Sequence, residues 1–171
     1  VARDEAFCFF YEDNFRYLER MGCRVVCFSP LREKCLPDGT DGLWLCGGYP
    51  ELYASDLSRN LEMRRAVRDA VRSGMPCIAE CGGFLYLQES LMGETGALHE
   101  MTGVFSGHGF RKNRLERFGY IELSLQEGRL FGREQMNLRA HEFHYYDCSD
   151  PGCAFLAKKA SGESRWMTGA A

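Results

Sequence analysis

The chain has 171 residues, with 21 basic and 24 acidic side chains and 45% hydrophobic residues. These values are typical of one ordinary globular domain and exclude a disordered, collagenous or coiled-coil chain. No apolar run approaches the roughly 20 residues of a membrane span, and a net charge of −3 disfavours nucleic-acid binding. The opening residues VARDEAFCFF also lack a basic-then-apolar signal pattern. We therefore expect neither a nucleic-acid partner nor a membrane.

The chain contains nine cysteines, an odd number that cannot pair completely within one molecule. Cys27, Cys46 and Cys77 lie in apolar runs, where a reduced cysteine behaves as a small buried hydrophobe. This predicts a reducing, cytoplasmic location. There is no CxxC pair, and the nearest spacings, Cys23/Cys27 and Cys77/Cys81, disfavour structural zinc. We expect no metal in this chain.

The first 92 residues alternate between strand-like and helix-like patterns. Short apolar runs predict strands at residues 6–10, 22–28, 43–46 and 75–80. Helical patterns cover residues 13–22, 57–74 and 81–92. This order favours a mostly parallel sheet with helices on its faces, an α/β fold of three layers.

Two further local signals refine this description. The helix over 57–74 has Ser55 as its expected N-cap, with Ser58 as a rival, and Gly74 as its stop. Residues 118–125, 137–146 and 154–160 read as strands, so the second half is β-rich. We expect one domain over residues 1–171.

A reactive residue type follows the strand at 75–80. Cys81 stands between that strand and Gly82-Gly83, the pattern of a nucleophile elbow, with Ala79 in place of its first glycine. At a helix N-terminus the partial positive charge lowers a thiol pKa, and the Gly82 N–H faces a developing oxyanion. Cys81 is the candidate nucleophile; a cysteine that only packs at a strand end is the alternative.

A second glycine loop follows the strand at 43–46. Gly47 and Gly48 stand at its carboxyl end, the edge at which parallel sheets bind ligands. Their bare backbone could offer N–H groups to an oxyanion, or could form a simple turn.

The segment AHEFHY (140–145) carries a histidine and carboxylate pattern. If it is a strand, Glu142 and His144 share a face and His141 points the other way. The pair could orient a base, bind a polar substrate, resemble part of a metal site, or be structural. His99 and His108 are interpreted as surface or loop residues.

The stretch RKNRLERFGY (111–120) carries four basic residues. This pattern is typical of a solvated face, and a docking patch for an acidic partner or substrate is the alternative.

These pieces together resemble a known family. The resemblance is carried by residues 1–14, 41–54, 60–67, 74–87, 119–123 and 141–146, above all CGGYPEL and AECGGFLYL. The sequence resembles the glutamine amidotransferase domain of cobyrinic acid a,c-diamide synthases, in the triad-type superfamily. The resemblance implies a class I amidotransferase-like, flavodoxin-like fold.

The resemblance also implies a reaction. Cys81 would attack glutamine and form a γ-glutamyl thioester, with Gly48 and Gly82 as the oxyanion hole. Gly47, Glu80, Gly83, Glu142 and His144 would bind substrate. The ammonia released would serve the ATP-dependent amidation of the a and c carboxylates of cobyrinic acid.

The family uses further parts that this sequence does not display. A separate N-terminal P-loop synthetase domain would use ATP and Mg²⁺ and bind the corrin precursor, but no P-loop pattern occurs here. The family's general base is a histidine near the C-terminus, and the sequence stops at RWMTGAA before that segment is expected. We therefore expect a domain truncated at both ends. His144 is the fallback base if the chain is complete, and a homodimer is left open.

Three alternatives stay open at this stage. The amidated substrate could be a related tetrapyrrole, since the residues that choose it belong to the synthetase part. Cys81 could serve redox sensing or the hydrolysis of another substrate. The chain could also be a docking module for a tetrapyrrole or a partner domain.

Overall fold

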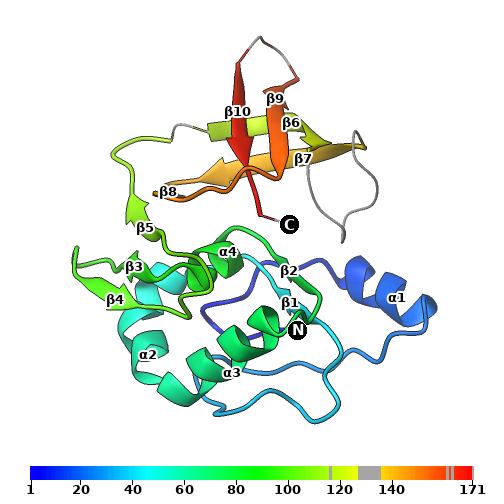
Figure 1. Cartoon of the computed structure of the whole chain (residues 1–171), viewed down its shortest axis with the longest axis vertical. Coiled ribbons are helices and arrows are strands. Elements are labelled where there is room, and N and C mark those ends of the chain that lie inside the picture. Colours follow the sequence, from blue (N-terminus) through cyan, green and yellow to red (C-terminus); the bar gives the residue numbers. More distant parts are fainter. Residues whose placement is uncertain (116, 127–135, 161, 163, 171) are drawn as a thin grey trace. The chain divides into compact units, whose positions relative to one another are not determined.

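The computed structural model describes residues 1–115, 117–126, 136–160, 162 and 164–170. The chain divides into two compact units, Val1–Gly109 and Phe110–Ala171, and each is described by itself. The helices belong to the first unit, and the second is built from strands (Figure 1). The predicted α/β first part and β-rich second part are therefore confirmed.

The helices and the two central strands of the first unit follow one another as predicted, but two predicted strands do not form and most elements are shorter than predicted. They are α1 (Glu12–Arg20), β1 (Leu43–Leu45), the 3-10 helix η1 (Pro50–Tyr53), α2 (Ala54–Arg59), α3 (Leu61–Arg72), β2 (Cys77–Ala79), α4 (Gly82–Leu87), β3 (Ser90–Met92) and β4 (Leu98–Glu100). Strand β5 (His108–Arg111) runs across the boundary between the units. Among the described residues, no helix combines the length and apolarity needed to cross a bilayer.

The central strands of the first unit are parallel. β1 pairs with β2, with Leu43 opposite Cys77 and Leu45 opposite Ala79. This register brings the carboxyl ends of the two strands, and the glycine loops that follow them, to the same edge. β3 pairs with β5 in parallel but with β4 in the antiparallel sense. The sheets are thus partly antiparallel, which the prediction of a mostly parallel sheet did not include.

Two predicted strands are wrong. Residues 6–10 and 22–28 contribute only isolated bridges, Phe9 with Gly47 and Phe28 with Ala2. Residues 4–7 form a tight turn instead, in which Asp4 and Phe7 exchange backbone hydrogen bonds of 3.2 Å. The 22–28 segment is mostly exposed, and Cys27, which we expected in the core, is exposed as well. Val26 and Phe28 exchange backbone hydrogen bonds with Val1 and Arg3, whereas Gly22 and Cys23 donate to carbonyl groups at the end of α1.

The long helix predicted over 57–74 is two helices. Asn60 interrupts it with a non-helical backbone (ψ 67°) and serves as the N-cap residue of α3. Its side-chain amide donates to the carbonyl oxygens of Pro30 (2.8 Å) and Glu33 (2.7 Å), so the break ties this helix pair to a distant loop. Neither Ser55 nor Ser58 caps a helix. The stop at Gly74 is confirmed, because α3 ends at Arg72 and Gly74 has φ +95°.

The helix predicted over 81–92 ends early, at Leu87. The 101–105 loop donates to the last carbonyl groups, with Thr102 N–H to Tyr86 (3.1 Å) and Phe105 N–H to Leu87 (3.0 Å). Because the loop satisfies these acceptors, the chain turns into β3 without a further helical turn.

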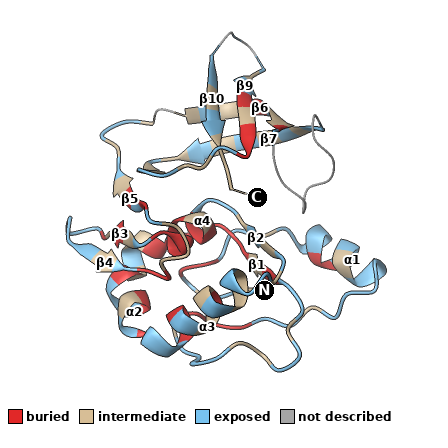
Figure 2. Cartoon of the chain, viewed as in Figure 1, coloured by how far each residue is buried: buried red, intermediate tan, exposed pale blue. Residues whose placement is uncertain are grey.

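The core of the first unit gathers around α4 and β1. Figure 2 shows buried residues along α4. Tyr86 of this helix packs edge-on against Phe7, with ring centroids 5.4 Å apart.

The first unit also contains a buried cation. Arg64 of α3 donates to the carbonyl oxygens of Met101 and Ser58, each at 2.8 Å, and pairs with Glu100 at 3.0 Å. These partners compensate for the desolvation of the guanidinium group.

The second unit is a four-stranded antiparallel sheet in the order β10-β9-β6-β7. Its elements are β6 (Arg117–Leu125), β7 (Asn137–His144), β8 (Tyr146–Cys148), β9 (Phe155–Lys159) and β10 (Arg165–Thr168). Leu125, Ala154 and Phe155 form its buried cluster, with Leu123 and Leu138 packed against them. The three strands predicted in this half are confirmed.

Leu45 offers a test of the first unit's core. Leu45, the last residue of β1, is 0% exposed, whereas Leu52 on η1 is 50% exposed. Leu45→Ala should lower the free energy of unfolding in urea by about 2–5 kcal/mol, because a buried cavity opens. The control Leu52→Ala should change it by less than about 1 kcal/mol. Equal effects of the two variants would contradict this description of the core.

Candidate active site

Cys81 occupies a strained turn between β2 and α4. Its backbone has φ +50° and ψ −111°, and in the part of the chain that the structure describes it is the one non-glycine residue with positive φ. A side chain at positive φ costs free energy and is retained where surrounding contacts enforce it. This is the geometry of a nucleophile elbow, in which the side chain projects from a sharp strand-to-helix turn.

Backbone hydrogen bonds close the turn on both sides. The Glu80 N–H donates to the Leu45 carbonyl at 3.0 Å, which joins the end of β2 to β1. The Gly83 N–H donates to the Glu80 carbonyl at 2.8 Å, and the Leu85 N–H to the Cys81 carbonyl at 3.1 Å. The Glu80 carboxylate accepts a hydrogen bond of 3.1 Å from the Trp44 indole N–H.

Glycine is required after the cysteine because the helix approaches β1 closely. A Cβ on Gly83 would lie 2.0 Å from the Leu45 carbonyl oxygen, and one on Gly82 would lie 2.7 Å from Cδ of Pro50. The Leu45 backbone cannot move away from a side chain at position 83 without opening the turn. The sequence predicted an elbow from the Gly-Gly pair, and the structure supplies the atoms that leave no room for side chains there.

The loop after β1 lies against the elbow. A Cβ on Gly47 would be 3.3 Å from Cβ of Cys81, and one on Gly82 would be 3.2 Å from the Gly48 nitrogen. The structure therefore brings together Gly47, Gly48, Gly82 and Cys81, which are candidates predicted from two separate motifs. Their assigned roles stay predictions.

Cys81 is exposed, but the surrounding atoms still desolvate its thiol. Desolvation raises the pKa of Cys81, and the charges of Glu51 and Glu80 raise it further. The backbone N–H groups of Gly82 and Gly48 act in the opposite direction, because they hydrogen-bond the thiolate and lower the pKa. Their effect is outweighed, so the net lowering expected at a helix N-terminus is wrong. The raised pKa favours the protonated thiol, so a reaction at this sulfur calls for a base.

Glu142 and His144 belong to the second unit and form a pair on one face of β7. The His144 Nε2 lies 4.0 Å from a Glu142 oxygen, and its Nδ1 lies 2.5 Å from the Tyr146 carbonyl oxygen. The other Glu142 oxygen lies 3.8 Å from Nζ of Lys159. The predicted shared face is confirmed. The nearby Glu142 carboxylate raises the pKa of His144, and desolvation only partly opposes it.

The remaining sequence candidates have local partners. His99 lies in β4 and is half-buried, and His108 lies in β5 and is exposed, so the surface interpretation is confirmed for His108 and neither is a loop residue. In the basic stretch, Lys112 lies 3.7 Å from Asp147, and Arg117 stacks over the Trp166 ring at 5.1 Å. Among the described residues, no three His, Cys, Asp or Glu side chains cluster as metal ligands would.

A cavity of about 440 Å³ lies in the first unit, lined by residues that include Glu5, Arg32, Asp56 and Arg59. Its arginines are already paired, Arg32 with Glu5 and Arg59 with Asp56. None of the predicted site residues lines it.

The sequence missed two residues beside Cys81. Glu51 acts on the thiol through its charge, and Pro50 packs against Gly82. Both directly follow the glycine loop in CGGYPEL, so adjacency to that motif was the available signal.

A known protein family matches almost the whole chain. The model of the CobB/CobQ-like glutamine amidotransferase domain matches residues 1–166. The chain belongs to this family of glutamine amidotransferase domains.

Curated relatives carry a common name, cobyrinate a,c-diamide synthase. The proteins from Salmonella typhimurium and Caldanaerobacter subterraneus subsp. tengcongensis are 41% and 36% identical to the chain over 99% and 98% of its length. A Listeria innocua protein is 38% identical over 98%. The chain spans 38% of the length of each of these relatives.

The Glu142–His144 pair makes a testable electrostatic prediction. Glu142→Gln should lower the pKa of His144, because the substitution removes the negative charge that favours the protonated ring. The pKa is measured by following the His144 ring protons by NMR against pH. Glu122→Gln, at an exposed position of β6, is the matched control and should leave the titration unchanged.

The same pair sets the sign of a pH effect on stability. A raised pKa in the folded state stabilises the protein below the unfolded-state pKa of histidine, and that stability is lost as pH rises through the folded value. Glu142→Gln should flatten this fall. An unchanged His144 titration in Glu142→Gln would contradict the assigned contact.

Proposed function

We propose that this chain is a glutaminase domain with Cys81 as its nucleophile. The observation that carries the proposal is the placement of the Gly48 and Gly82 N–H groups against Cys81, from two different loops. Two such donors suit the negative oxygen that forms when a thiolate attacks an amide. Membership of the amidotransferase family supports the same assignment.

The chemistry proceeds in two balanced steps. A base removes the Cys81 proton, and the sulfur attacks the side-chain amide carbon of glutamine to give an oxyanion held by Gly48 and Gly82. The C–N bond then breaks, the nitrogen takes a proton, and ammonia leaves a γ-glutamyl thioester. Water adds to the thioester carbon, and loss of the sulfur gives glutamate and the free thiol.

The other site assignments are also proposals. Gly47, Glu80 and Gly83 lie on the two loops around Cys81 and would contact glutamine. Glu142 and His144 keep the substrate-binding role proposed from sequence. Because the raised pKa of Cys81 favours the protonated thiol, the mechanism calls for a general base, and His144, whose pKa is raised, is the fallback residue for it. A low-pKa redox-sensing thiol is disfavoured by the same raised Cys81 pKa.

The fold proposed with this function is that of class I glutamine amidotransferases, a flavodoxin-like sheet. The parallel β1–β2 pair with both glycine loops at its carboxyl edge supports it.

The relatives' name suggests the reaction that would use the ammonia. We propose that the ammonia serves the amidation of the a and c carboxylates of cobyrinic acid in cobalamin biosynthesis. Relatives more than twice as long as this chain have room for a P-loop synthetase domain, which would bind ATP, Mg²⁺ and the corrin precursor. That domain would also choose between cobyrinic acid and a related tetrapyrrole.

Removal of the nucleophile tests the glutaminase assignment. In the full-length protein, Cys81→Ser should lower the rate of glutamate release from glutamine by about a thousandfold or more. Cys35→Ser, the same change at an exposed cysteine of the first unit, should leave the rate close to that of the parent. Full glutaminase activity in Cys81→Ser would rule out this mechanism.

A further inference from the structure

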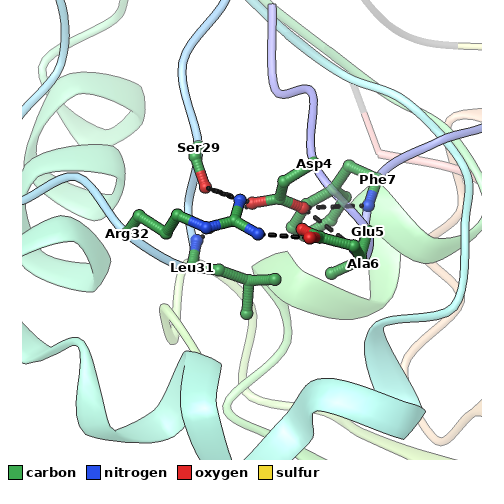
Figure 3. Close-up of polar contacts among 7 residues, drawn as sticks. All are labelled: Asp4, Glu5, Ala6, Phe7, Ser29, Leu31 and Arg32. Carbon is green, nitrogen blue, oxygen red and sulfur yellow. Dashed lines mark hydrogen bonds and ion pairs between the residues drawn. The ribbon is translucent and has the colours of Figure 1, made fainter.

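Asp4 lies at the centre of a polar network near the start of the chain (Figure 3). One of its carboxylate oxygens accepts the N–H groups of Ala6 (2.9 Å) and Phe7 (3.2 Å). The other accepts the Ser29 hydroxyl (2.8 Å) and the Leu31 N–H (3.0 Å). Four donors thus occupy both oxygens, and three of them are backbone N–H groups, of which that of Phe7 is shared with the Asp4 carbonyl.

This network fixes the turn at residues 4–7. The turn also has reciprocal backbone hydrogen bonds between Asp4 and Phe7, and its Ala6 and Phe7 side chains are fully buried. The contacts with Ser29 and Leu31 anchor the turn to a loop about 25 residues further along the chain. The position of the Ala6 carbonyl is therefore set by the Asp4 carboxylate.

The 4–7 turn supports the glycine loop that follows β1. The Ala6 carbonyl accepts the Tyr49 N–H at 3.0 Å, and the Phe9 N–H donates to the Gly47 carbonyl at 2.9 Å. These two bonds hold the peptide groups on either side of Gly48. A Cβ on Gly48 would lie only 2.2 Å from the Ala6 oxygen, so Gly48 is pressed directly against the turn.

We propose that Asp4 is a positioning residue, which aims the Gly48 N–H at Cys81 through the Ala6 carbonyl. The inference rests on the proposed glutaminase function for its kinetic consequence. Asp4 itself touches neither Cys81 nor its attacking sulfur; it acts through the 4–7 turn. The network determines how well one of the two oxyanion donors is aligned, and misalignment of a donor weakens stabilisation of the transition state.

The test compares Asp4→Asn with Asp69→Asn in the full-length protein. Both variants exchange a carboxylate for an amide, but Asp69 is an exposed residue of α3 that pairs with Arg68. The amide in Asp4→Asn can no longer accept all four donors. We expect its kcat for glutamine hydrolysis to fall about tenfold to a hundredfold with KM nearly unchanged, since a displaced oxyanion donor acts on the transition state. Asp69→Asn should match the parent.

A second readout needs no glutaminase activity. The rate of Cys81 alkylation by iodoacetamide is followed against pH by peptide mass spectrometry. Because the Gly48 N–H lowers the pKa of Cys81, Asp4→Asn should shift this profile to higher pH, and Asp69→Asn should not. A protein that fails to hydrolyse glutamine would overturn the proposed function, while the alkylation profile would still decide the role of Asp4.

The outcomes separate positioning from simple stability. A lower melting temperature in Asp4→Asn with unchanged kcat and an unchanged Cys81 profile would overturn the proposal. If Asp4→Asn does not fold, Ser29→Ala removes one of the four donors and should shift both readouts in the same direction by a smaller amount. Readouts equal to those of the parent in Ser29→Ala would then overturn it.

Discussion

The close approach of α4 to β1 is the constraint on which the candidate site depends. The Leu45 carbonyl accepts the Glu80 N–H and occupies the space that a side chain at Gly83 would need. Because the chain must turn within these few residues, Cys81 adopts a positive φ that costs about 1–3 kcal/mol. The buried packing of Leu45 and Tyr86 offsets that strain. The turn is thus a property of the core as much as of the motif.

Different groups around Cys81 act on the resting thiol and on the charge that forms when it reacts. Desolvation, Glu51 and Glu80 raise the pKa of Cys81 and so favour the protonated thiol, whereas the N–H groups of Gly48 and Gly82 favour a negative charge. Under the proposed mechanism these donors act mainly on the charge that develops during the reaction. A site built in this way stabilises a transient oxyanion without maintaining a standing thiolate, which would react with oxidants.

The elements that the sequence predicted correctly depend on adjacent residues. The strand, cysteine and two glycines of the elbow are contiguous, and the shared face of Glu142 and His144 follows from the two-residue period of a strand. The errors depend on distant partners. The helix breaks at Asn60 because its side chain donates to the carbonyl groups of Pro30 and Glu33. The 4–7 turn forms in place of the start of a strand because Asp4 accepts hydrogen bonds from Ser29 and Leu31. The sign of the Cys81 pKa shift likewise required knowledge of burial that no local pattern contains.

The covalent intermediate gives the most direct test of the central claim, that Cys81 attacks glutamine at this turn. The full-length protein would be mixed with isotopically labelled glutamine, quenched in acid during turnover, and digested for peptide mass spectrometry. The account predicts a γ-glutamyl group on the peptide that contains Cys81, and none on the peptides of the exposed Cys35 and Cys153. Turnover of glutamine with the label on another residue, or with Cys81 unmodified throughout, would contradict it.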